Sequence, residues 1–353
     1  MRQQYSEALE RLSEGSETPR SVIVIPNWNG WPDTIRCLAS IQNLANCSVE
    51  VLVIDNASTG KDVDEIRAWC AGRHGLVLKE HNNPEGDAAG CGHSDAGYQG
   101  LRILLVRSPT NSGFSAAVNI GLRYAAARGA RYAWLLNNDT TVEQDSLARL
   151  EEVAHAHGDL VLVSSRIVSM DDPSRNWFEG GIYRPATATS AHVAHSIFSS
   201  ATHPYLTACA LLIPVAVLNR IGLFNEALFL YGEDVDYSIR ARRDHIPLRV
   251  ALKSVVRHKG SASSIVRSPS AYRFHVRNII WVMCEHHGRA RLLTIIPCQL
   301  AKLALLCLSG KVSRAAAGAY LRALYDAIRC CAPWPFVPAA GRLVAGSSRV
   351  RHK

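Results

Sequence analysis

The chain has 353 residues, of which 48% are hydrophobic and 20% charged, and its formal net charge is +9. This balance is that of an ordinary globular protein with a sizeable core, which excludes a disordered or fibrous chain. The ten cysteines include no Cys-x-x-Cys pair, and the N-terminal residues contain no apolar signal core. Both features favour a protein of the reducing cytoplasm.

The positive charge is concentrated at the C-terminus. Residues 288–353 contain eleven Lys or Arg side chains and a single acidic one, Asp326. We therefore divide the chain into a polar leader (residues 1–20), a main domain (residues 21–287) and a basic helical tail (residues 288–353). A basic tail fits an anionic membrane surface, a nucleic acid or a role in solubility. Because the tail has no obvious motif for reading bases, we expect no nucleic-acid partner.

Apolar, β-branched runs alternate with helix patterns in the first part of the main domain. The runs predict buried strands at residues 21–26, 49–54, 103–106 and 132–136. A helix capped by Asp33 or Thr34 should follow the first run, and a polar surface loop is expected at residues 81–100. Strands that alternate with helices are typical of a parallel sheet with right-handed crossovers. Polar groups at the carboxyl ends of such strands face a ligand-binding cleft.

The second part of the main domain has less regular patterns. A helix is expected at residues 142–155, and strands are expected at residues 160–163 and 254–256. Residues 171–205 are expected to form loops and edge strands over the cleft.

Two asparagines and one aspartate follow the fourth predicted strand. Asp139 at this position can hold a divalent cation through one carboxylate while phosphate oxygens complete the coordination shell. The alternative is that Asp139 or Thr140 only caps the next helix.

A helix start that contains glycine follows the third predicted strand. Residues 111–119 read Asn-Ser-Gly-Phe-Ser-Ala-Ala-Val-Asn, and backbone N–H groups at such a start suit a diphosphate. The alternative is an ordinary cap on a helix of small residues that packs against the sheet.

An acidic cluster, Glu233, Asp234 and Asp236, lies between the apolar run 227–230 and a helix-like segment. The structural interpretation is that the helix dipole favours acidic residues at its start. The apolar approach, however, would partly desolvate a carboxylate, and a desolvated carboxylate is a usable general base. His258 follows a predicted strand in the same half of the chain and is placed to complete a metal site.

In these ordered motifs the chain resembles the family 2 glycosyltransferases, particularly their bacterial rhamnosyltransferase-like branch. The resemblance runs from residue 21 to residue 278, and it depends on the order and spacing of the segments 22–29, 53–58, 111–119, 136–140, 222–226, 231–236 and 258–264. It implies an α/β GT-A fold, which is Rossmann-like with a mostly parallel central sheet flanked by helices, here with a C-terminal helical extension.

The resemblance also implies roles for individual residues. Asp234 looks like the base that deprotonates the acceptor hydroxyl, and Glu233 would position the acceptor or the base. Mg²⁺ or Mn²⁺ would be held by Asp139 and His258, with Asn137 standing where many relatives have an aspartate. The residues implied in nucleotide binding are Pro26, Asn29, Asp55, Asn111, Gly113 and Asn138.

The implied activity is an inverting transfer of a sugar, with rhamnose as one candidate, from a dTDP-, UDP- or GDP-linked donor. The acceptor would be a lipid-linked or other saccharide in the synthesis of cell-surface polysaccharide. Two alternatives remain open: a catalytically impaired, membrane-associated scaffold of the same fold, and a sugar nucleotidyltransferase. The second would need a Gly-rich loop with Arg and Lys after the first strand, and residues 27–31 do not form one.

The basic tail contains two apolar helix patterns. Residues 292–308 are apolar but interrupted by Pro297, Gln299 and Lys302, so we do not expect them to span a bilayer. From residue 311 to residue 329 an apolar face opposes a basic one, which predicts a peripheral, interfacial helix at the inner face of the plasma membrane. The alternative is a pair of helices packed on the main domain with a solvated basic face.

Overall fold

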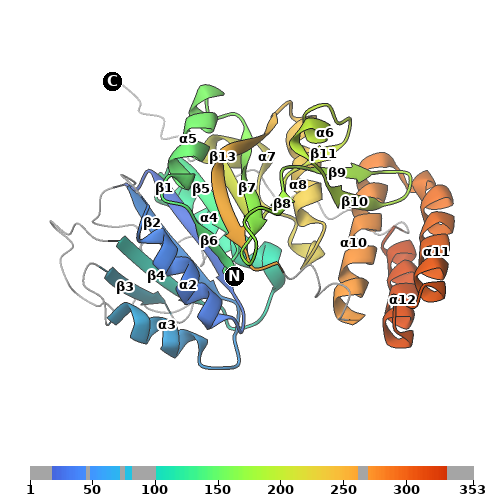
Figure 1. The fold of residues 1–353 in the computed structure, drawn as a ribbon, viewed down its shortest axis with the longest axis horizontal. Helices are drawn as coiled ribbons and strands as arrows, with labels where there is room; N and C mark the ends of the chain where they lie inside the picture. Colours follow the sequence, from blue (N-terminus) through green and yellow to red (C-terminus); the bar gives the residue numbers. More distant parts are fainter. Residues whose placement is uncertain (1–17, 45–47, 72–75, 82–100, 261–268, 332–353) are drawn as a thin grey trace, which may run out of the picture.

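The computed structural model describes residues 18–44, 48–71, 76–81, 101–260 and 269–331. A mixed sheet forms the centre of the molecule, and long helices from the C-terminal part of the chain lie together at one side of it (Figure 1). Most of the predicted leader and of the predicted polar loop lies outside the described residues.

The central sheet has ten strands within the described residues. In spatial order they are β3 (Leu76–His81), β4 (Leu101–Arg107), β2 (Val49–Asp55), β1 (Ser21–Asn27), β5 (Tyr132–Leu136), β12 (Ala210–Pro214), β7 (Leu162–Ser169), β13 (Leu248–His258) and β6 (Thr140–Val142), with β8 (Asn176–Phe178) paired to β7. The strands from β3 to β5 run parallel, as do β7 and β13, whereas β12, β6 and β8 are antiparallel to their neighbours. The expected mostly parallel sheet is confirmed, and β3 is a strand that the sequence analysis did not predict.

Strands β1, β2 and β5 are buried along nearly their whole length, as their continuous apolar runs predict. Pro26 lies near the end of β1, in the middle of the sheet. The pairing of β1 with β5 stops at Val24, so the missing N–H of Pro26 interrupts no bond between these two strands. Because neighbouring parallel strands end at the same edge, the polar residues that follow β1, β2 and β5 are brought together.

Helices cover the sheet (Figure 1). They are α2 (Trp31–Ile41), α3 (Asp62–Ala71), α4 (Gly113–Ala127), α5 (Ser146–Ala156), α7 (Val215–Ile221) and α8 (Glu233–Arg243). Helix α4 packs on β1, β2 and β5 and also contacts α7, which in turn contacts α8. A Cβ atom at Gly121 would stand 2.2 Å from Cγ1 of Val24, so the close approach of α4 to β1 requires glycine there.

Two predicted helix starts are wrong. Helix α2 begins at Trp31 with Gly30 at the N-cap position, so Asp33 and Thr34 lie inside its first turns. Helix α5 begins at Ser146 because β6 occupies the residues directly after Asp139. Asp139 therefore caps no helix, and its interpretation as a helix cap is wrong.

A small antiparallel sheet lies beside the central one. It contains β9 (Gly181–Arg184), β10 (Thr189–His192) and β11 (Pro204–Tyr205), and α6 (His195–Ser199) connects β10 to β11. The loops and edge strands predicted for residues 171–205 are thus confirmed.

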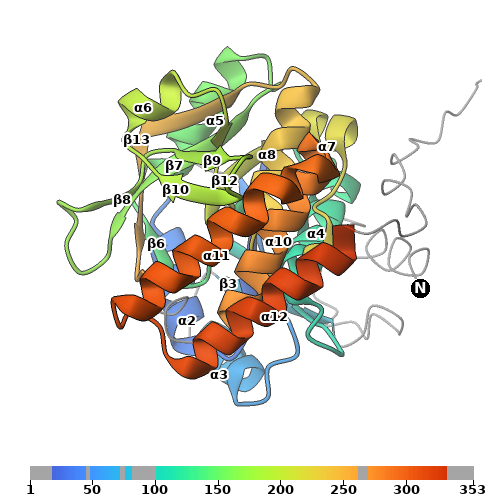
Figure 2. The same cartoon turned by 90° about the vertical axis from the view of Figure 1, so that its right-hand side faces the viewer.

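Three long helices complete the described part of the chain (Figure 2). They are α10 (Pro269–His287), α11 (Leu292–Leu308) and α12 (Arg314–Cys331), and the turn η2 (Arg289–Arg291) leads into α11. Helix α12 packs on α10 and buries Ala316, Tyr320, Ala323 and Ala327. The apolar face that was predicted to enter a membrane is therefore covered by protein, and the alternative of a packed helix pair is correct for α12.

Helix α11 has a different environment. Together with η2 it forms a 20-residue segment with a mean hydropathy of 1.7 in its most apolar window, and only 17% of that window is buried. Among the described residues it is the one helix long and apolar enough to cross a membrane by length and composition.

Candidate active site

The loop after β1 is held by a hub of buried polar side chains. Asn27 Nδ2 donates to Asp55 Oδ1 at 3.0 Å and to Asp62 Oδ1 at 3.1 Å. Asp62 Oδ1 also accepts from the backbone nitrogen of Gly30 at 2.7 Å. Neither Asn27 nor Asp62 was predicted as a site residue. Asn27 ends the apolar run of β1, whereas Asp62 begins α3 after a polar stretch and had no such signal. The hub fixes the path of the chain between β1 and α2.

The residues predicted to contact the nucleoside lie around this hub. Asp55 is fully buried, and its second oxygen accepts from the backbone nitrogen of Ser58 at 3.2 Å. Asn29 has a φ of 51° and accepts from the backbone nitrogen of Thr59 at 2.9 Å. Pro26 is half-buried at the end of β1. The structure thus brings Pro26, Asn29 and Asp55 together, with Asp55 organising the loop from within.

A second cluster joins the end of β2 to the start of α4. Asn56 Nδ2 donates to Asn111 Oδ1 at 3.0 Å and to the carbonyl oxygen of Gly113 at 3.1 Å. Gly113 has a φ of 86°, and a Cβ there would stand 2.4 Å from the carbonyl oxygen of Phe229. Glycine is therefore required where α4 meets the loop that precedes α8.

The prediction that the start of α4 offers free N–H groups to a diphosphate is wrong. The amides of Ser112, Gly113 and Phe114 donate instead to Asn56 Oδ1, Asn111 Oδ1 and the carbonyl oxygen of Phe229. This helix start is a packed cap, as the alternative interpretation stated. Asn111 and Gly113 are bonded to each other and to Asn56, so they fix the path of the chain at this point.

The turn between β5 and β6 carries the candidate metal ligand. Asn138 Nδ2 donates to Thr34 Oγ1 at 3.0 Å, which fastens the turn to α2. Asp139 Oδ1 lies 3.1 Å from His258 Nε2. The two residues meet because β6 pairs with the end of β13, where His258 lies opposite Thr140.

The surroundings of His258 are largely apolar. Its ring is buried and meets the ring of Trp177 edge to face, with the centroids 4.5 Å apart. Burial lowers the pKa of His258, but the charges and hydrogen bonds of Cys209 and Asp139 outweigh it and raise the pKa well above its ordinary value. Trp177 and Cys209 come from β8 and from the approach to β12, and no local sequence signal linked them to the site.

The Asp139 and His258 side chains fit a divalent cation that displaces the proton of His258, because only the neutral imidazole is a metal ligand. A carboxylate and an imidazole are both metal ligands, and Nδ1 of His258 is buried without a hydrogen-bond partner in the structure. No cluster of three or more His, Cys, Asp or Glu side chains suited to a metal occurs within the described residues. A cation at this pair would therefore take most of its coordination shell from substrate oxygens and water.

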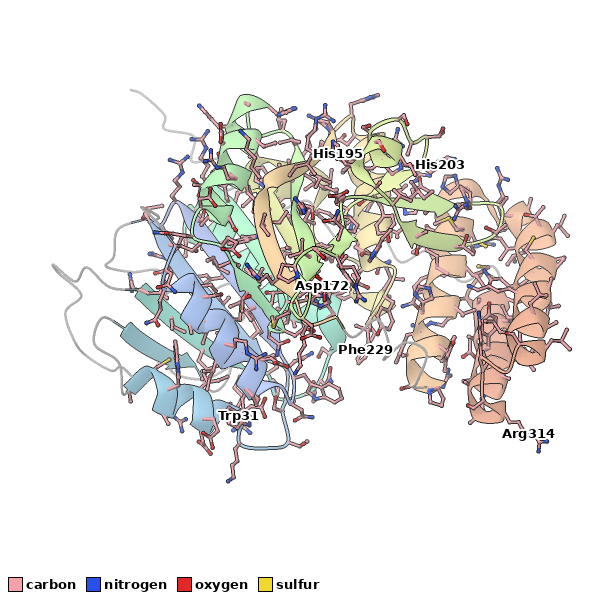
Figure 3. All side chains as sticks on the ribbon, in the orientation of Figure 1. Trp31, Asp172, His195, His203, Phe229 and Arg314 are labelled. Carbon is pink, nitrogen blue, oxygen red and sulfur yellow. The ribbon has the colours of Figure 1, made fainter. Side chains whose placement is uncertain are left out.

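The loop before α8 is strained and firmly held. Phe229, Tyr231 and Gly232 all have positive φ values, a conformation that costs free energy for residues other than glycine. Asn278 of α10 is fully buried, and its amide donates to the carbonyl oxygens of Leu230 and Tyr231, each at 2.9 Å. Trp31 and Phe229 both lie in the lower half of the view in Figure 3. Helix α10 therefore holds the approach to the acidic cluster in place.

Helix α8 begins at Glu233, so the acidic cluster occupies its first turn. Burial, together with the charge of Asp234, raises the pKa of Glu233 to about 8. Burial also raises the pKa of Asp234 to about 6, although backbone N–H groups oppose the shift. Glu233 Oε2 is buried without a hydrogen-bond partner in the structure. Two adjacent carboxyls with pKa values pushed apart can act as a proton donor and a base at the same pH.

The third acid of the cluster has another role. Asp236 Oδ1 lies 2.7 Å from His286 Nε2, and its Oδ2 accepts from Arg240 Nε at 2.9 Å. Although burial opposes the effect, Arg240 and His286 lower the pKa of Asp236. Asp236 is thus an ion-pair partner that fastens α8 to α10.

A short backbone segment connects the acidic pair to the metal pair. Asp234 accepts a hydrogen bond from the backbone of Ala208, and the backbone nitrogen of Asn137 donates to the carbonyl oxygen of Cys209 at 2.9 Å. The Asp234 carboxylate and the turn that carries Asp139 are therefore both bonded to the segment 208–209.

The unusual protonation of Glu233 predicts a pH-dependent effect on stability. Its pKa rises from an ordinary 4.5 to about 8 on folding, so folding takes up a proton between these values. Glu233 therefore stabilises the folded protein at low pH, and this contribution to the free energy of unfolding is lost as the pH rises through 8. Glu233→Gln, which stays neutral, should match the wild type near pH 4 and melt a few degrees higher above pH 8.

Thermal unfolding followed by circular dichroism at several pH values measures this difference. Glu152→Gln is the matched control, because Glu152 is an exposed carboxylate on α5. A difference between Glu233→Gln and wild type that did not change with pH would contradict a raised pKa.

Comparisons with known proteins identify the family and the fold of this chain. The family model described as Glycosyl transferase family 2 matches residues 22–94 and 92–202. The low-salt glycan biosynthesis hexosyltransferase Agl10 of Haloferax volcanii is 24% identical over 233 residues, which is 64% of this chain and 62% of the relative. The chain thus aligns with less than two thirds of that relative's length.

Solved structures share the fold. Residues 1–349 of S. aureus TarS superpose with a TM-score of 0.50 at 15% identity, covering 89% of this chain and 81% of the other. The same TarS fragment in complex with UDP-GlcNAc gives a TM-score of 0.51 at 16% identity, covering 88% and 81%. The expected GT-A fold with a C-terminal helical region is confirmed. Since the family match extends over just over half of its residues, the chain belongs to glycosyl transferase family 2.

Proposed function

We propose that the protein is an inverting glycosyltransferase that moves a hexose from a nucleoside-diphosphate sugar to an acceptor hydroxyl. The observation that carries the proposal is the buried pair Glu233 and Asp234, whose pKa values are raised to about 8 and about 6, together with the Asp139 and His258 pair. Displacement of a nucleoside diphosphate needs a base on one side of the anomeric carbon and charge neutralisation on the other.

In this mechanism Asp234 is ionised and Glu233 is protonated near neutral pH. Asp234 accepts the proton of the acceptor hydroxyl while the acceptor oxygen forms its bond to the anomeric carbon. The bond from that carbon to the diphosphate oxygen breaks on the opposite face, so the configuration inverts. Glu233 donates a hydrogen bond that positions the acceptor, and its neutral state avoids a second negative charge beside the base.

The opposite side of the reaction centre handles the leaving group. Asp139 and His258 would hold Mg²⁺ or Mn²⁺, which neutralises charge on the departing diphosphate. Asn137, adjacent in the same turn, contributes no charge, so this site would hold a cation with one carboxylate.

The donor nucleotide would occupy the loops that surround Asn27 and Asn56. We assign the nucleoside to the loops that carry Pro26, Asn29 and Asp55, and the remaining contacts to Asn111, Gly113 and Asn138. The dTDP-, UDP- and GDP-linked sugars are the donor candidates, with rhamnose as one candidate sugar.

The acceptor is proposed to be a lipid-linked saccharide at the cytoplasmic face of the plasma membrane, in the synthesis of cell-surface polysaccharide. Two findings support this assignment: the relative in Haloferax volcanii is named for glycan biosynthesis, and α11 exposes an apolar surface.

Release of nucleoside diphosphate from a panel of dTDP-, UDP- and GDP-sugars tests the function, with polyprenyl-diphosphate saccharides as acceptors and with Mg²⁺, Mn²⁺ or EDTA. We expect release from one donor that depends on metal and acceptor, and NMR of the product should show an inverted anomeric centre. Retention of configuration would contradict the mechanism, and failure of every donor to bind would favour a scaffold that has lost catalysis.

A further inference from the structure

Helix α11 exposes most of its apolar side chains. Leu293, Leu305 and Leu308 are 82%, 67% and 86% exposed. By helical spacing Leu293, Pro297, Ala304 and Leu308 form one stripe on the side opposite the buried residues Ile295, Gln299 and Leu303. Soluble proteins rarely expose a continuous apolar surface of this kind unless it binds a partner or a membrane.

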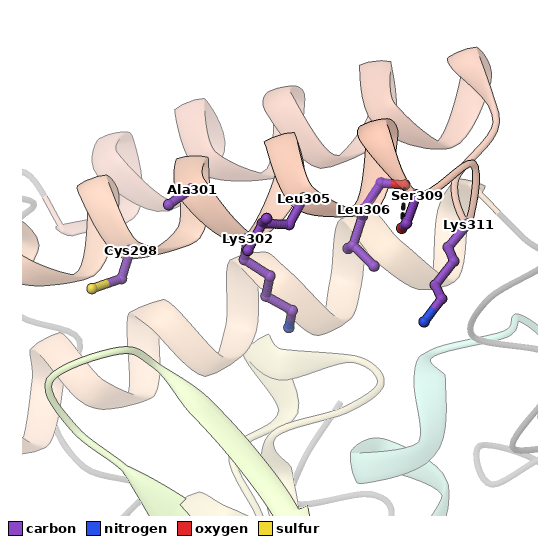
Figure 4. Close-up of a pocket in the computed structure, with 7 residues that line it drawn as sticks. All are labelled: Cys298, Ala301, Lys302, Leu305, Leu306, Ser309 and Lys311. Atoms are coloured by element: carbon purple, nitrogen blue, oxygen red, sulfur yellow. Dashed lines mark hydrogen bonds between the residues drawn. The ribbon is translucent and has the colours of Figure 1, made fainter.

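A groove of about 580 Å³ runs along the edge of this stripe (Figure 4). Lys302 and Lys311 extend toward the same side of α11 there, and Leu305 lines the groove between them (Figure 4). The described part of the tail, residues 288–331, contains seven Lys or Arg side chains and one acid, Asp326. Asp326 is engaged by Arg273 at 2.9 Å, so this surface suits an anionic partner.

The packing of α11 favours a position along a membrane rather than across it. Gln299 is almost fully buried near the middle of the helix, and its amide donates to the carbonyl oxygens of Thr187 and Ala188, the latter at 2.9 Å. Those carbonyls belong to the turn between β9 and β10. Such a turn cannot enter the hydrocarbon core of a bilayer at the depth of a helix centre. One face of α11 is therefore fixed to the protein, and the other is bare, as in helices that lie in an interface.

We propose that the outer stripe of α11 inserts into the interface of an anionic bilayer and that the groove at Lys302 and Lys311 binds lipid phosphate groups. The leucines would then contact acyl chains, while the two lysines extend from the edge of the helix to the headgroups. This proposal deepens the membrane location given in the proposed function and rests on that function only for its biological setting. Lipid binding itself requires no sugar transfer.

Co-sedimentation of the full chain with vesicles tests the proposal. Wild type should bind vesicles of phosphatidylcholine mixed with phosphatidylglycerol and should bind vesicles of phosphatidylcholine alone much less. Lys302→Gln combined with Lys311→Gln, and separately Leu293→Gln combined with Leu308→Gln, should each lower binding about tenfold or more. These residues are exposed or line the groove, so circular dichroism should show an unchanged fold.

Leu252 and Lys253 provide matched controls, because both are exposed on β13 in the main domain. Leu252→Gln combined with Lys253→Gln should bind as wild type does. Equal binding by the α11 variants, an equal loss in the control, or no binding by wild type would overturn the proposal. Displacement by inorganic phosphate at moderate ionic strength would assign the groove to a soluble anion and would also overturn it.

Nucleoside-diphosphate release with a soluble acceptor, measured on the same samples, separates the two proposals. Lipid binding without turnover of any donor would remove the proposed reaction and leave the surface in place. Turnover without lipid binding would remove the proposed lipid-binding surface and leave the proposed reaction in place.

Discussion

Asp234→Asn should lower the maximal rate of sugar transfer by about 10²–10⁴-fold, the range that a positioned general base contributes. Asparagine has nearly the shape of aspartate and can still accept from the backbone of Val235, as Asp234 does at 2.8 Å, so the fold should persist. The contacts around Asn27 and Asn56 are untouched, and binding of the donor should change little. Nucleoside-diphosphate release at saturating donor and acceptor measures the rate, and titration of the donor measures its binding.

The pH dependence of the same reaction gives a second readout. Because burial raises the pKa of Asp234 to about 6, the base is protonated below that value, and kcat/KM should rise with pH through 6. It should fall again above about pH 8, where Glu233 loses the proton that it donates to the acceptor. The residual kcat/KM of Asp234→Asn should not show this rise with pH through 6. Glu152→Gln, an exposed carboxylate on α5, should keep both the rate and the pH dependence of wild type. A wild-type rate in Asp234→Asn would remove the base assignment.

The parts of this centre that follow from local sequence could be predicted. Strands β1, β2 and β5 are continuous apolar runs, and the acidic residues of α8 follow an apolar approach, so each is visible within a few residues. The resemblance to family 2 then placed Asp234, Asp139 and His258 in order along the chain. These predictions depend on no knowledge of which strands pair.

The parts that depend on distant pairing could not be predicted. Trp177 and Cys209 reach His258 only because β7 pairs with both β8 and β13 and because β12 pairs with β5. Asn278 supports the loop before α8 from a helix about fifty residues away in the chain. Such contacts leave no periodicity in the sequence.

Besides the two helix starts, two further predictions were corrected, and both have the same origin. The amides at the start of α4 looked free for a diphosphate because their acceptors, Asn56 and Phe229, come from other segments of the chain. The apolar face of α12 looked suited to lipid because a face that packs on α10 and one that enters an interface have the same helical period. Structure decides between them, and it leaves α11 as the exposed apolar helix.

Asp139→Asn should lower metal-dependent transfer by about 100-fold or more, because loss of even an outer-shell partner of a metal site costs about 10–100-fold. The change removes the carboxylate of the Asp139 and His258 pair and leaves the buried imidazole without its charged partner. A neutral amide is a weaker ligand for Mg²⁺ or Mn²⁺, so the metal concentration that gives half-maximal rate should rise. Titration of nucleoside-diphosphate release with each metal measures both effects.

Asn137 offers a change in the opposite direction. Its backbone nitrogen is held by Cys209, and its half-buried side chain lies in the same turn as Asp139. Asn137→Asp would add a second carboxylate to this turn, so the metal concentration for half-maximal rate should fall below that of wild type. A loss of thermal stability in Asp139→Asn with an unchanged metal requirement would instead identify the pair as a purely structural ion pair. Opposite shifts in the two variants would show that the charge of this turn sets the affinity for the cation.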